Sequence, residues 1–198
     1  GFHFDVMHVD GKSVPHVFQD VREESAQVIG GMDFDAIAIG GNLASHRNII
    51  AGNGSNELIQ ATLMVTVGEG KRVLISEPTF ALYRQVATVL GGEVESVALT
   101  SALNYDVEAL QRIVKEKQPD VTIICSPNNP TGNQLDRQEM IEVVDSLEDR
   151  LVLIDEAYVD FADYSLSCDA IKRNNVIVLR TLSKAFGLAG ARVGYIVS

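Results

Sequence analysis

The stretch of this sequence that decides the fold is Val176-Ile-Val-Leu-Arg-Thr-Leu-Ser-Lys-Ala-Phe-Gly-Leu-Ala-Gly-Ala-Arg-Val-Gly-Tyr-Ile-Val197. Its first four residues are apolar and mostly β-branched, which predicts a buried strand. Polar Thr181, Ser183 and Lys184 follow at the carboxyl end of that strand, where ligands bind in open α/β sheets. A lysine considered alone is most simply a solvent-exposed side chain. Between hydroxyl groups and a Gly-rich turn, however, its amine is well placed to form a Schiff base with a carbonyl compound.

Composition limits the classes of protein to consider. The chain has 198 residues, enough for one large domain, and 46% of them are hydrophobic, enough for a substantial core. Its 16 basic and 27 acidic residues give a net charge of −11, which argues against nucleic acid as a partner. Its two cysteines, Cys125 and Cys168, lack metal-ligand spacing, so we predict no metal site and a reducing compartment. We find neither an apolar run near the roughly 20 residues that span a membrane nor a signal peptide after Gly1, and we expect a cytoplasmic protein.

Apolar runs of strand length alternate with helical patterns from residue 48 onward. This alternation is typical of βαβ units and predicts a three-layer α/β/α fold with a mostly parallel sheet. The expected strands are a short one beginning at Asn48, followed by 72–76, 93–98, 121–125, 151–154, 176–179 and 192–197. The expected helices are 57–67, 81–90, 107–117 and 136–147.

A strand, a glycine turn and a helix start follow one another in Asn48-Ile-Ile-Ala-Gly-Asn-Gly-Ser-Asn-Glu-Leu-Ile59. Ser55 and Asn56 are favoured N-cap residues, so we expect the helix to begin at them. The backbone N–H groups and the positive end of such a helix can bind an anion. The simpler interpretation is a plain capped helix. The strand-to-helix context and Arg192, whose planar guanidinium suits a phosphate, favour an anion site.

Two further loops place polar residues after strands. The loop Ser126-Pro-Asn-Asn-Pro-Thr-Gly132 follows an apolar strand, and its prolines and glycine leave Asn128 and Asn129 little conformational freedom. An ordinary Asn-Pro turn is the alternative, but the whole string at a strand end indicates a binding loop. Asp155 ends the next apolar strand, where an unpaired carboxylate is costly.

Asp155 therefore needs a cationic partner, and a protonated pyridine nitrogen is one that cofactor enzymes use. The alternative is that Asp155 caps the turn at residues 156–158. Tyr158 can donate a hydrogen bond to a phenolate oxygen. Phe80 can cover one face of a ring, although an aromatic residue after Pro-Thr is otherwise most often part of the core.

Together these motifs resemble the class II aminotransferases that depend on pyridoxal 5′-phosphate (PLP), most closely the histidinol-phosphate aminotransferases, over about residues 46–198. The resemblance implies a large PLP-binding domain of fold type I. It implies transamination in histidine biosynthesis, with glutamate or 2-oxoglutarate and imidazole-acetol phosphate or histidinol phosphate as small-molecule substrates. It also implies a homodimer, with no nucleic acid or membrane as a partner.

The resemblance implies a role for each matching residue. Three residues would be catalytic: Lys184 would form the Schiff base and later move a proton between the substrate's Cα and the cofactor, Asp155 would keep the pyridine nitrogen protonated, and Tyr158 would bind the ring's O3′ oxygen. Asn129 would also bind O3′, and Phe80 would stack on the ring. The phosphate would be held by Ser55, Asn56, Thr181, Ser183 and Arg192.

Two parts of the sequence depart from that family. Residues 1–45 do not resemble an aminotransferase N-terminus, and residues 16–41 instead resemble a segment of tRNA-guanine transglycosylases. This combination is what a chimera of two genes would give. The family continues into a small C-terminal domain that supplies an arginine for the substrate carboxylate, whereas this sequence stops at Ser198. We therefore expect residues 46–198 to form a partial large domain with a complete cofactor half and an incomplete substrate half. The alternatives are a cofactor-binding but inactive fragment or chimera, and another PLP enzyme of fold type I.

Overall fold

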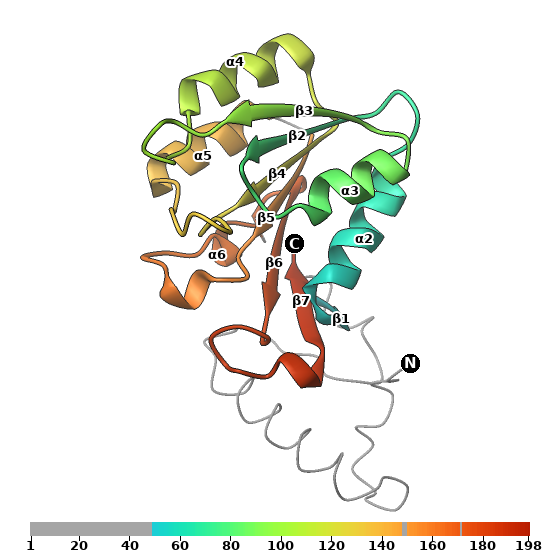
Figure 1. The fold of residues 1–198 in the computed structure, drawn as a ribbon, viewed down its shortest axis with the longest axis vertical. Coiled ribbons are helices and arrows are strands. Elements are labelled where there is room, and N and C mark those ends of the chain that lie inside the picture. Colours follow the sequence, from blue (N-terminus) through green and yellow to red (C-terminus); the bar gives the residue numbers. More distant parts are fainter. Residues whose placement is uncertain (1–48, 148–149, 171) are drawn as a thin grey trace, which may run out of the picture.

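The structure is a computed structural model that describes residues 49–147, 150–170 and 172–198. A seven-stranded sheet lies between two layers of helices (Figure 1). The strands follow the order β1-β7-β6-β5-β4-β2-β3. The predicted three-layer α/β/α fold is therefore confirmed. The predictions made for residues 1–45, including the resemblance of residues 16–41, lie outside the described residues.

All the predicted strands and helices are present, with ends that shift by a few residues. The strands are β1 (Ile49–Asn53), β2 (Arg72–Glu77), β3 (Glu93–Ala98), β4 (Val121–Cys125), β5 (Leu151–Asp155), β6 (Val176–Thr181) and β7 (Val193–Val197). The helices are α2 (Gly54–Thr66), α3 (Leu82–Val89), α4 (Val107–Lys117), α5 (Arg137–Ser146) and the short, unpredicted α6 (Ser167–Ala170). None of these described helices is long and apolar enough to cross a membrane.

The pairing of the strands brings several carboxyl ends to one edge of the sheet. β3, β2, β4, β5 and β6 pair in parallel, whereas β7 runs antiparallel to its neighbours β1 and β6. At the ends of β4, β5 and β6, the register partners are Cys125, Asp155 and Leu179. Side chains that follow these three strands are therefore neighbours at the edge where such sheets bind ligands.

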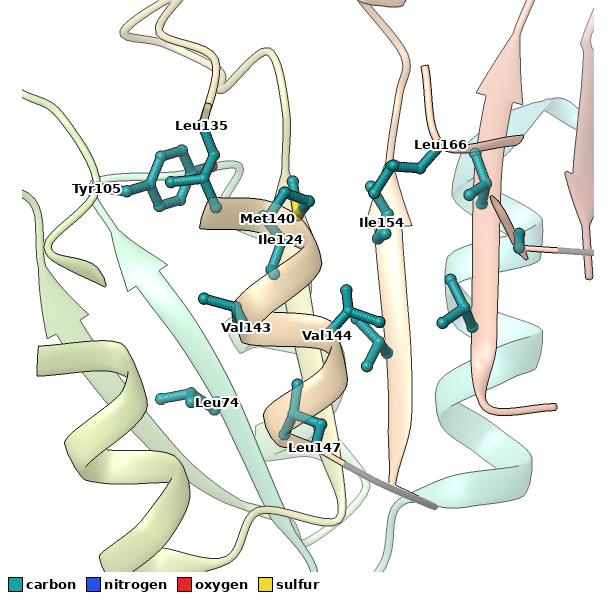
Figure 2. Packing of buried hydrophobic residues seen from close by; sticks show 14 of the residues in the cluster. Leu74, Tyr105, Ile124, Leu135, Met140, Val143, Val144, Leu147, Ile154 and Leu166 are labelled. Carbon is teal, nitrogen blue, oxygen red and sulfur yellow. The ribbon is translucent and has the colours of Figure 1, made fainter. Parts of the chain in front are cut away.

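The sheet has an apolar core on each face, because its central strands are buried on both sides. α4, α5 and α6 cover one face, and α2 and α3 cover the other (Figure 1). Figure 2 shows the first core, in which α5 places Met140, Val143 and Val144 over the sheet. In the second core, Ile59 of α2 and Tyr83 of α3 are fully buried.

Alternation along β5 assigns the two acidic residues at its end to opposite faces of the sheet. Leu153 belongs to the core beneath α2 and α3, whereas Ile154 belongs to the core beneath α4, α5 and α6. Successive side chains of a strand point to opposite faces. Asp155 therefore lies on the α3 side, and Glu156 lies on the α6 side.

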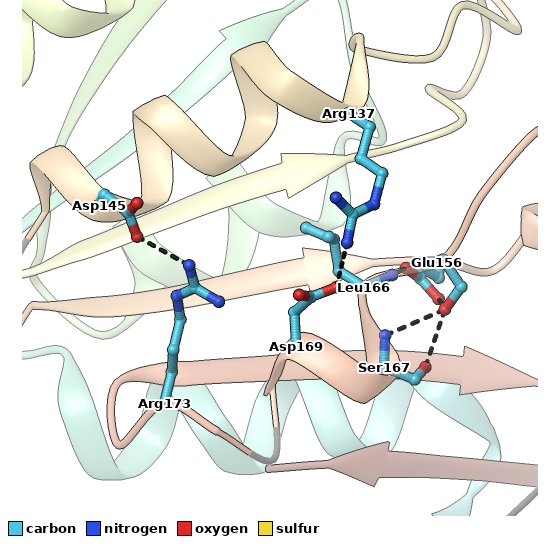
Figure 3. Close-up of polar contacts among 8 residues, drawn as sticks. Arg137, Asp145, Glu156, Leu166, Ser167, Asp169 and Arg173 are labelled. Carbon is cyan, nitrogen blue, oxygen red and sulfur yellow. Dashed lines mark hydrogen bonds and ion pairs between the residues drawn. The ribbon is translucent and has the colours of Figure 1, made fainter.

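Polar contacts on the α6 side hold the segment that joins β5 to β6 (Figure 3). The buried Glu156 carboxylate accepts hydrogen bonds from the Ser165 hydroxyl at 2.7 Å and from the Leu166 N–H at 2.6 Å. Burial raises the pKa of Glu156, and these two hydrogen bonds oppose the rise. Nearer the surface, Arg137 pairs with Asp169 at 2.9 Å. These contacts fix the course of the chain directly after β5.

The start of α2 corrects one prediction. The sequence predicts N-caps at Ser55 and Asn56, but α2 begins at Gly54, so both residues lie in its first turn. Gly54 has a φ of 75°, a conformation that glycine adopts without steric strain. The glycine lets the chain turn directly from β1 into the helix, earlier than the cap pattern indicates.

The core of β4 contains a polar group that should lower stability. Thr122 is fully buried, and its hydroxyl has no hydrogen-bond partner among the residues that the structure describes. An unsatisfied buried polar group costs about 1–3 kcal/mol. Thr122→Val replaces the hydroxyl with a methyl group, so we expect the free energy of unfolding, measured by urea denaturation, to rise by about 1 kcal/mol.

The control for this prediction is the same substitution at a hydroxyl that is bonded. The Thr79 hydroxyl donates a 2.7 Å hydrogen bond to Asn128 Oδ1, so Thr79→Val should lower the free energy of unfolding. A Thr122→Val variant that is also destabilised would contradict the prediction.

Candidate active site

The residues predicted to act in catalysis meet at the carboxyl edge of the sheet. Asp155 is the last residue of β5, and Tyr158 follows it in the next turn of chain. Lys184 follows β6, and its Nζ lies 5.1 Å from the centroid of the Tyr158 ring. The Lys184 side chain is exposed, so its amine is open to a ligand.

Asp155 is a buried carboxylate that two donors hold. Its side chain is only 3% exposed. Oδ2 accepts a 2.5 Å hydrogen bond from the Tyr83 hydroxyl, and Oδ1 accepts a 2.9 Å hydrogen bond from the Ala157 N–H. Burial raises the pKa of Asp155, while the bonds from Tyr83 and Ala157 and the positive charge of Lys184 oppose the rise. The Ala157 bond shows that Asp155 caps the turn that follows β5, which is the alternative role considered from the sequence.

Tyr83 is the site residue that reasoning from the sequence missed. It lies in α3, and its hydroxyl bonds to Asp155 across 72 residues of sequence. Its ring also meets Phe80 edge-on, with ring centroids 5.6 Å apart and ring planes at 86°. In the sequence, Tyr83 appears as one more apolar position of an amphipathic helix. Phe80 precedes α3, so no helical spacing links the two aromatic residues, and the sequence carries no signal for the bond to Asp155.

The two asparagines of loop 126–132 have different roles. Asn128 is buried, and its side chain accepts a 2.7 Å hydrogen bond from the Thr79 hydroxyl and donates a 3.0 Å hydrogen bond to the Pro78 carbonyl. It therefore ties this loop to the loop that precedes α3. Asn129 is half-buried, and its side-chain amide makes no hydrogen bond with the residues that the structure describes. The Asn129 amide is therefore not tied to the described part of the protein, and its predicted contact with a cofactor stays a prediction.

Arg192 lies against the start of α2, where the sequence predicts a phosphate. A Cβ atom at Gly54 would lie 2.4 Å from Arg192 Nη2, so a side chain there would displace the guanidinium from its present place. A Cβ atom at Gly194 would lie 2.4 Å from the Ser55 backbone nitrogen, so β7 packs directly on the first turn of the helix. Arg192 Nη2 lies 3.5 Å from the Asn53 carbonyl, and no carboxylate in the described ranges pairs with it. The guanidinium and the helix N-terminus form a positively charged cradle.

The other predicted phosphate ligands differ in their hydrogen bonds and in their exposure. The buried Thr181 hydroxyl donates to the Val193 carbonyl at 3.2 Å and accepts the Ser183 N–H at 3.2 Å, so it organises the turn that precedes Lys184. Ser183 is half-buried, and its hydroxyl lies 3.1 Å from that of Thr181. Asn56 is exposed on α2, and its side chain contacts none of the other predicted site residues through a hydrogen bond within the described chain.

These features fit PLP, the cofactor that the sequence predicts. The cradle of Gly54 and Arg192 suits a phosphate, the buried Asp155 suits a protonated ring nitrogen, and the exposed Lys184 amine suits an aldehyde. Cys125 lies nearby at the end of β4, but burial raises the pKa of its thiol to about 12. Its thiol is therefore no nucleophile at neutral pH.

Comparisons with known proteins show which family this chain is similar to. Residues 13–198 match the family described as Aminotransferase class I and II. Histidinol-phosphate aminotransferase from Chlorobaculum parvum is 41% identical over 152 residues, which cover 76% of this chain and 42% of that protein. The protein of the same name from Thermoanaerobacter sp. (strain X514) is 40% identical over 152 residues, which cover 76% and 43%. The chain thus spans about two fifths of the length of the curated relatives that it matches.

Solved structures show the same fold. The crystal structure of histidinol-phosphate aminotransferase from Sinorhizobium meliloti in complex with pyridoxal-5′-phosphate has a TM-score of 0.72 and 26% identity, and the match covers 91% of this chain and 46% of that one. A decarboxylase from Sulfurospirillum multivorans has a TM-score of 0.69 and 27% identity, with 90% and 49% covered. The predicted resemblance is confirmed, and because the family match extends over residues 13–198, this chain belongs to the aminotransferases of class I and II.

Proposed function

We propose that this chain binds PLP and serves transamination, as part of a histidinol-phosphate:2-oxoglutarate aminotransferase of histidine biosynthesis. The observation that carries the proposal is a buried carboxylate, Asp155, beside an exposed amine, Lys184, at the carboxyl edge of the sheet. A buried carboxylate is costly without a cationic partner, and a protonated pyridine nitrogen is such a partner. The similarity to histidinol-phosphate aminotransferases supports the choice of substrate.

The side chains of the site would bind, orient and move a proton. When bound, PLP supplies a sink for the electron pair that is left on the substrate's Cα. Asp155 would pair with the ring nitrogen, while Asn129 and Tyr158 would donate hydrogen bonds to O3′ and Phe80 would cover one face. The Lys184 amine would hold the cofactor's aldehyde carbon and, once displaced by the substrate, would carry the proton from Cα to C4′.

The cradle at the start of α2 would hold the phosphate. Arg192 would supply two parallel N–H donors, and the N–H groups at Ser55 and Asn56 would donate from the first turn of the helix. The Ser183 hydroxyl would donate from the opposite loop, and Thr181 would keep that loop in place. The phosphate charge would compensate both the guanidinium and the positive end of the helix.

The remaining parts of the proposal rest on the resemblance to the family. Glutamate would donate the amino group, and imidazole-acetol phosphate would accept it to give histidinol phosphate, with 2-oxoglutarate as the other product. Residues 46–198 would be the cofactor-binding large domain of this enzyme. The enzyme would act as a homodimer in the cytoplasm.

Two alternatives remain distinct from transamination. Decarboxylation is the second candidate function, because the decarboxylase from Sulfurospirillum multivorans has a similar fold at 27% identity. A chain that binds PLP without turnover is the other alternative. Incubation with PLP and glutamate tests transamination, which forms 2-oxoglutarate. Incubation with PLP and each of a panel of amino acids tests decarboxylation, which releases carbon dioxide, and a chain without turnover gives neither product in any of these incubations.

Covalent binding of PLP should depend on Lys184, because this residue carries the exposed amine of the site. The wild-type protein with PLP should show a visible absorbance band, and borohydride reduction should leave the label on the Lys184 peptide in a mass spectrum. Lys184→Ala should lose both signals. Lys172→Ala, at an exposed lysine outside the site, should keep them. Equal labelling of the Lys184→Ala variant would contradict the proposal.

Arg192→Gln should weaken the binding of PLP more than that of pyridoxal, which has no phosphate. A hydrogen bond to a charged group contributes about 1.5–3 kcal/mol, so we expect the dissociation constant for PLP to rise roughly 10- to 100-fold. Equilibrium dialysis with each compound measures the difference. Arg137→Gln, which breaks a surface ion pair with Asp169, serves as the control and should change neither constant. Equal weakening for both compounds would rule out a phosphate contact.

A further inference from the structure

We propose that Tyr83 is a positioning residue of the cofactor site, with a hydroxyl that holds the Asp155 carboxylate and a ring that supports Phe80. The inference rests on the proposed function, because Asp155 and Phe80 are the two residues expected to contact the ring of PLP. Neither the sequence motifs nor the family resemblance assigned a role to Tyr83. Three observations carry the inference.

The first observation is that Tyr83 fixes the orientation of the Asp155 carboxylate. Its hydroxyl donates to Oδ2 at 2.5 Å, while the Ala157 N–H donates to Oδ1 at 2.9 Å. One donor comes from α3 and the other from the chain after β5, so the carboxylate cannot rotate without losing a bond. Among the described residues, no other group donates a hydrogen bond to Oδ2. Without the Tyr83 hydroxyl, Oδ2 would be a buried acceptor with no donor, which is costly for a charged group.

The second observation is that the same bond favours the ionised form of Asp155. Burial raises the pKa of Asp155, and the hydrogen bond from Tyr83 is the largest influence that opposes this rise. Burial also raises the pKa of Tyr83 well above its usual value, so the phenol keeps its proton and continues to donate. The other titratable groups near Asp155 are Cys125 of β4, Tyr105 before α4, Glu156 and Lys184. An ionised Asp155 is the form that pairs with a protonated ring nitrogen.

The third observation is the contact between the two aromatic rings. The Tyr83 side chain is 1% exposed and packs in the core beneath α2 and α3, so its ring is fixed. Phe80 is only partly buried, and it meets this ring edge-on with the centroids 5.6 Å apart. Edge-to-face contact is a favourable geometry for aromatic pairs. One buried side chain therefore supports both of the residues that would contact the ring of the cofactor.

The Tyr83→Phe variant separates these roles, because it removes the hydroxyl and keeps the ring. In the protein without PLP, a carbon-13 NMR titration should show a higher pKa for the Asp155 carboxyl group than in the wild type. With PLP, the dissociation constant should rise about tenfold or more. Nitrogen-15 NMR of labelled PLP should show that the ring nitrogen loses its proton at a lower pH. None of these measurements depends on turnover.

Tyr105→Phe is the matched control, because Tyr105 is another buried tyrosine whose hydroxyl donates to the protein, in this case to the Cys125 carbonyl. It should change neither the PLP dissociation constant nor the titration of the ring nitrogen. The Asp155→Asn background provides a second control. If Tyr83 acts through the carboxylate, adding Tyr83→Phe to Asp155→Asn should change PLP affinity much less than it does in the wild type.

The outcomes distinguish this inference from the proposed function. The inference would be supported if Tyr83→Phe raises the Asp155 pKa and weakens PLP binding. Tyr105→Phe should change neither quantity. An unchanged Asp155 pKa and unchanged PLP binding, beside a wild type that binds PLP through Lys184, would overturn this inference alone. A wild type that does not bind PLP would overturn the proposed function and, with it, the cofactor role of Tyr83. A loss of thermal stability in Tyr83→Phe without a shift in the Asp155 pKa would indicate a merely structural role and would also overturn the inference.

Discussion

The arrangement of the candidate site depends on the burial of one carboxylate, that of Asp155. Asp155 is almost completely buried, and a charged group in such a place has to be held by donors that the fold itself provides. The chain after β5 provides one donor at Ala157, and α3 provides the other at Tyr83. The surroundings of this carboxylate therefore depend both on the packing of α3 on the sheet and on the parallel register of β4, β5 and β6. The exposed Lys184 amine lies near this carboxylate, on the loop that follows β6.

Much of the fold could be predicted because its determinants are local. The runs 121–125 and 151–154 are apolar at every position but Thr122, which is typical of strands that are covered on both faces. The sequence does not show whether a strand runs parallel or antiparallel to its neighbours, because the alternation of side chains is the same in both cases. The antiparallel direction of β7 is therefore known only from its pairing with β1 and β6. The predicted cap at Ser55 and Asn56 was wrong because Gly54 starts the helix with a positive φ.

The residues of the candidate site that could be predicted are those at the ends of strands. Asp155 ends β5 and Lys184 follows β6, and the ends of these strands meet at one edge of the sheet. Tyr83 could not be found in this way, because its bond to Asp155 joins residues that are far apart in sequence and its helix pattern is that of any core residue. The two asparagines of loop 126–132 are chemically identical, and only their contacts distinguish them. Among the described residues, the Asn128 side chain forms hydrogen bonds and the Asn129 side chain forms none.

Two consecutive acidic residues, the last residue of β5 and the one that follows it, lie on opposite faces of the sheet. Asp155 faces α3 and the candidate cofactor site, whereas Glu156 faces α6 and anchors the following loop through Ser165 and Leu166. Because strand side chains alternate, a slip of β5 by one residue against its neighbours would exchange these surroundings. The longer acid would then enter the site, and the loop would lose its anchor. The backbone ladder that β5 forms with β4 and β6 therefore determines which of two adjacent carboxylates lies at the candidate site.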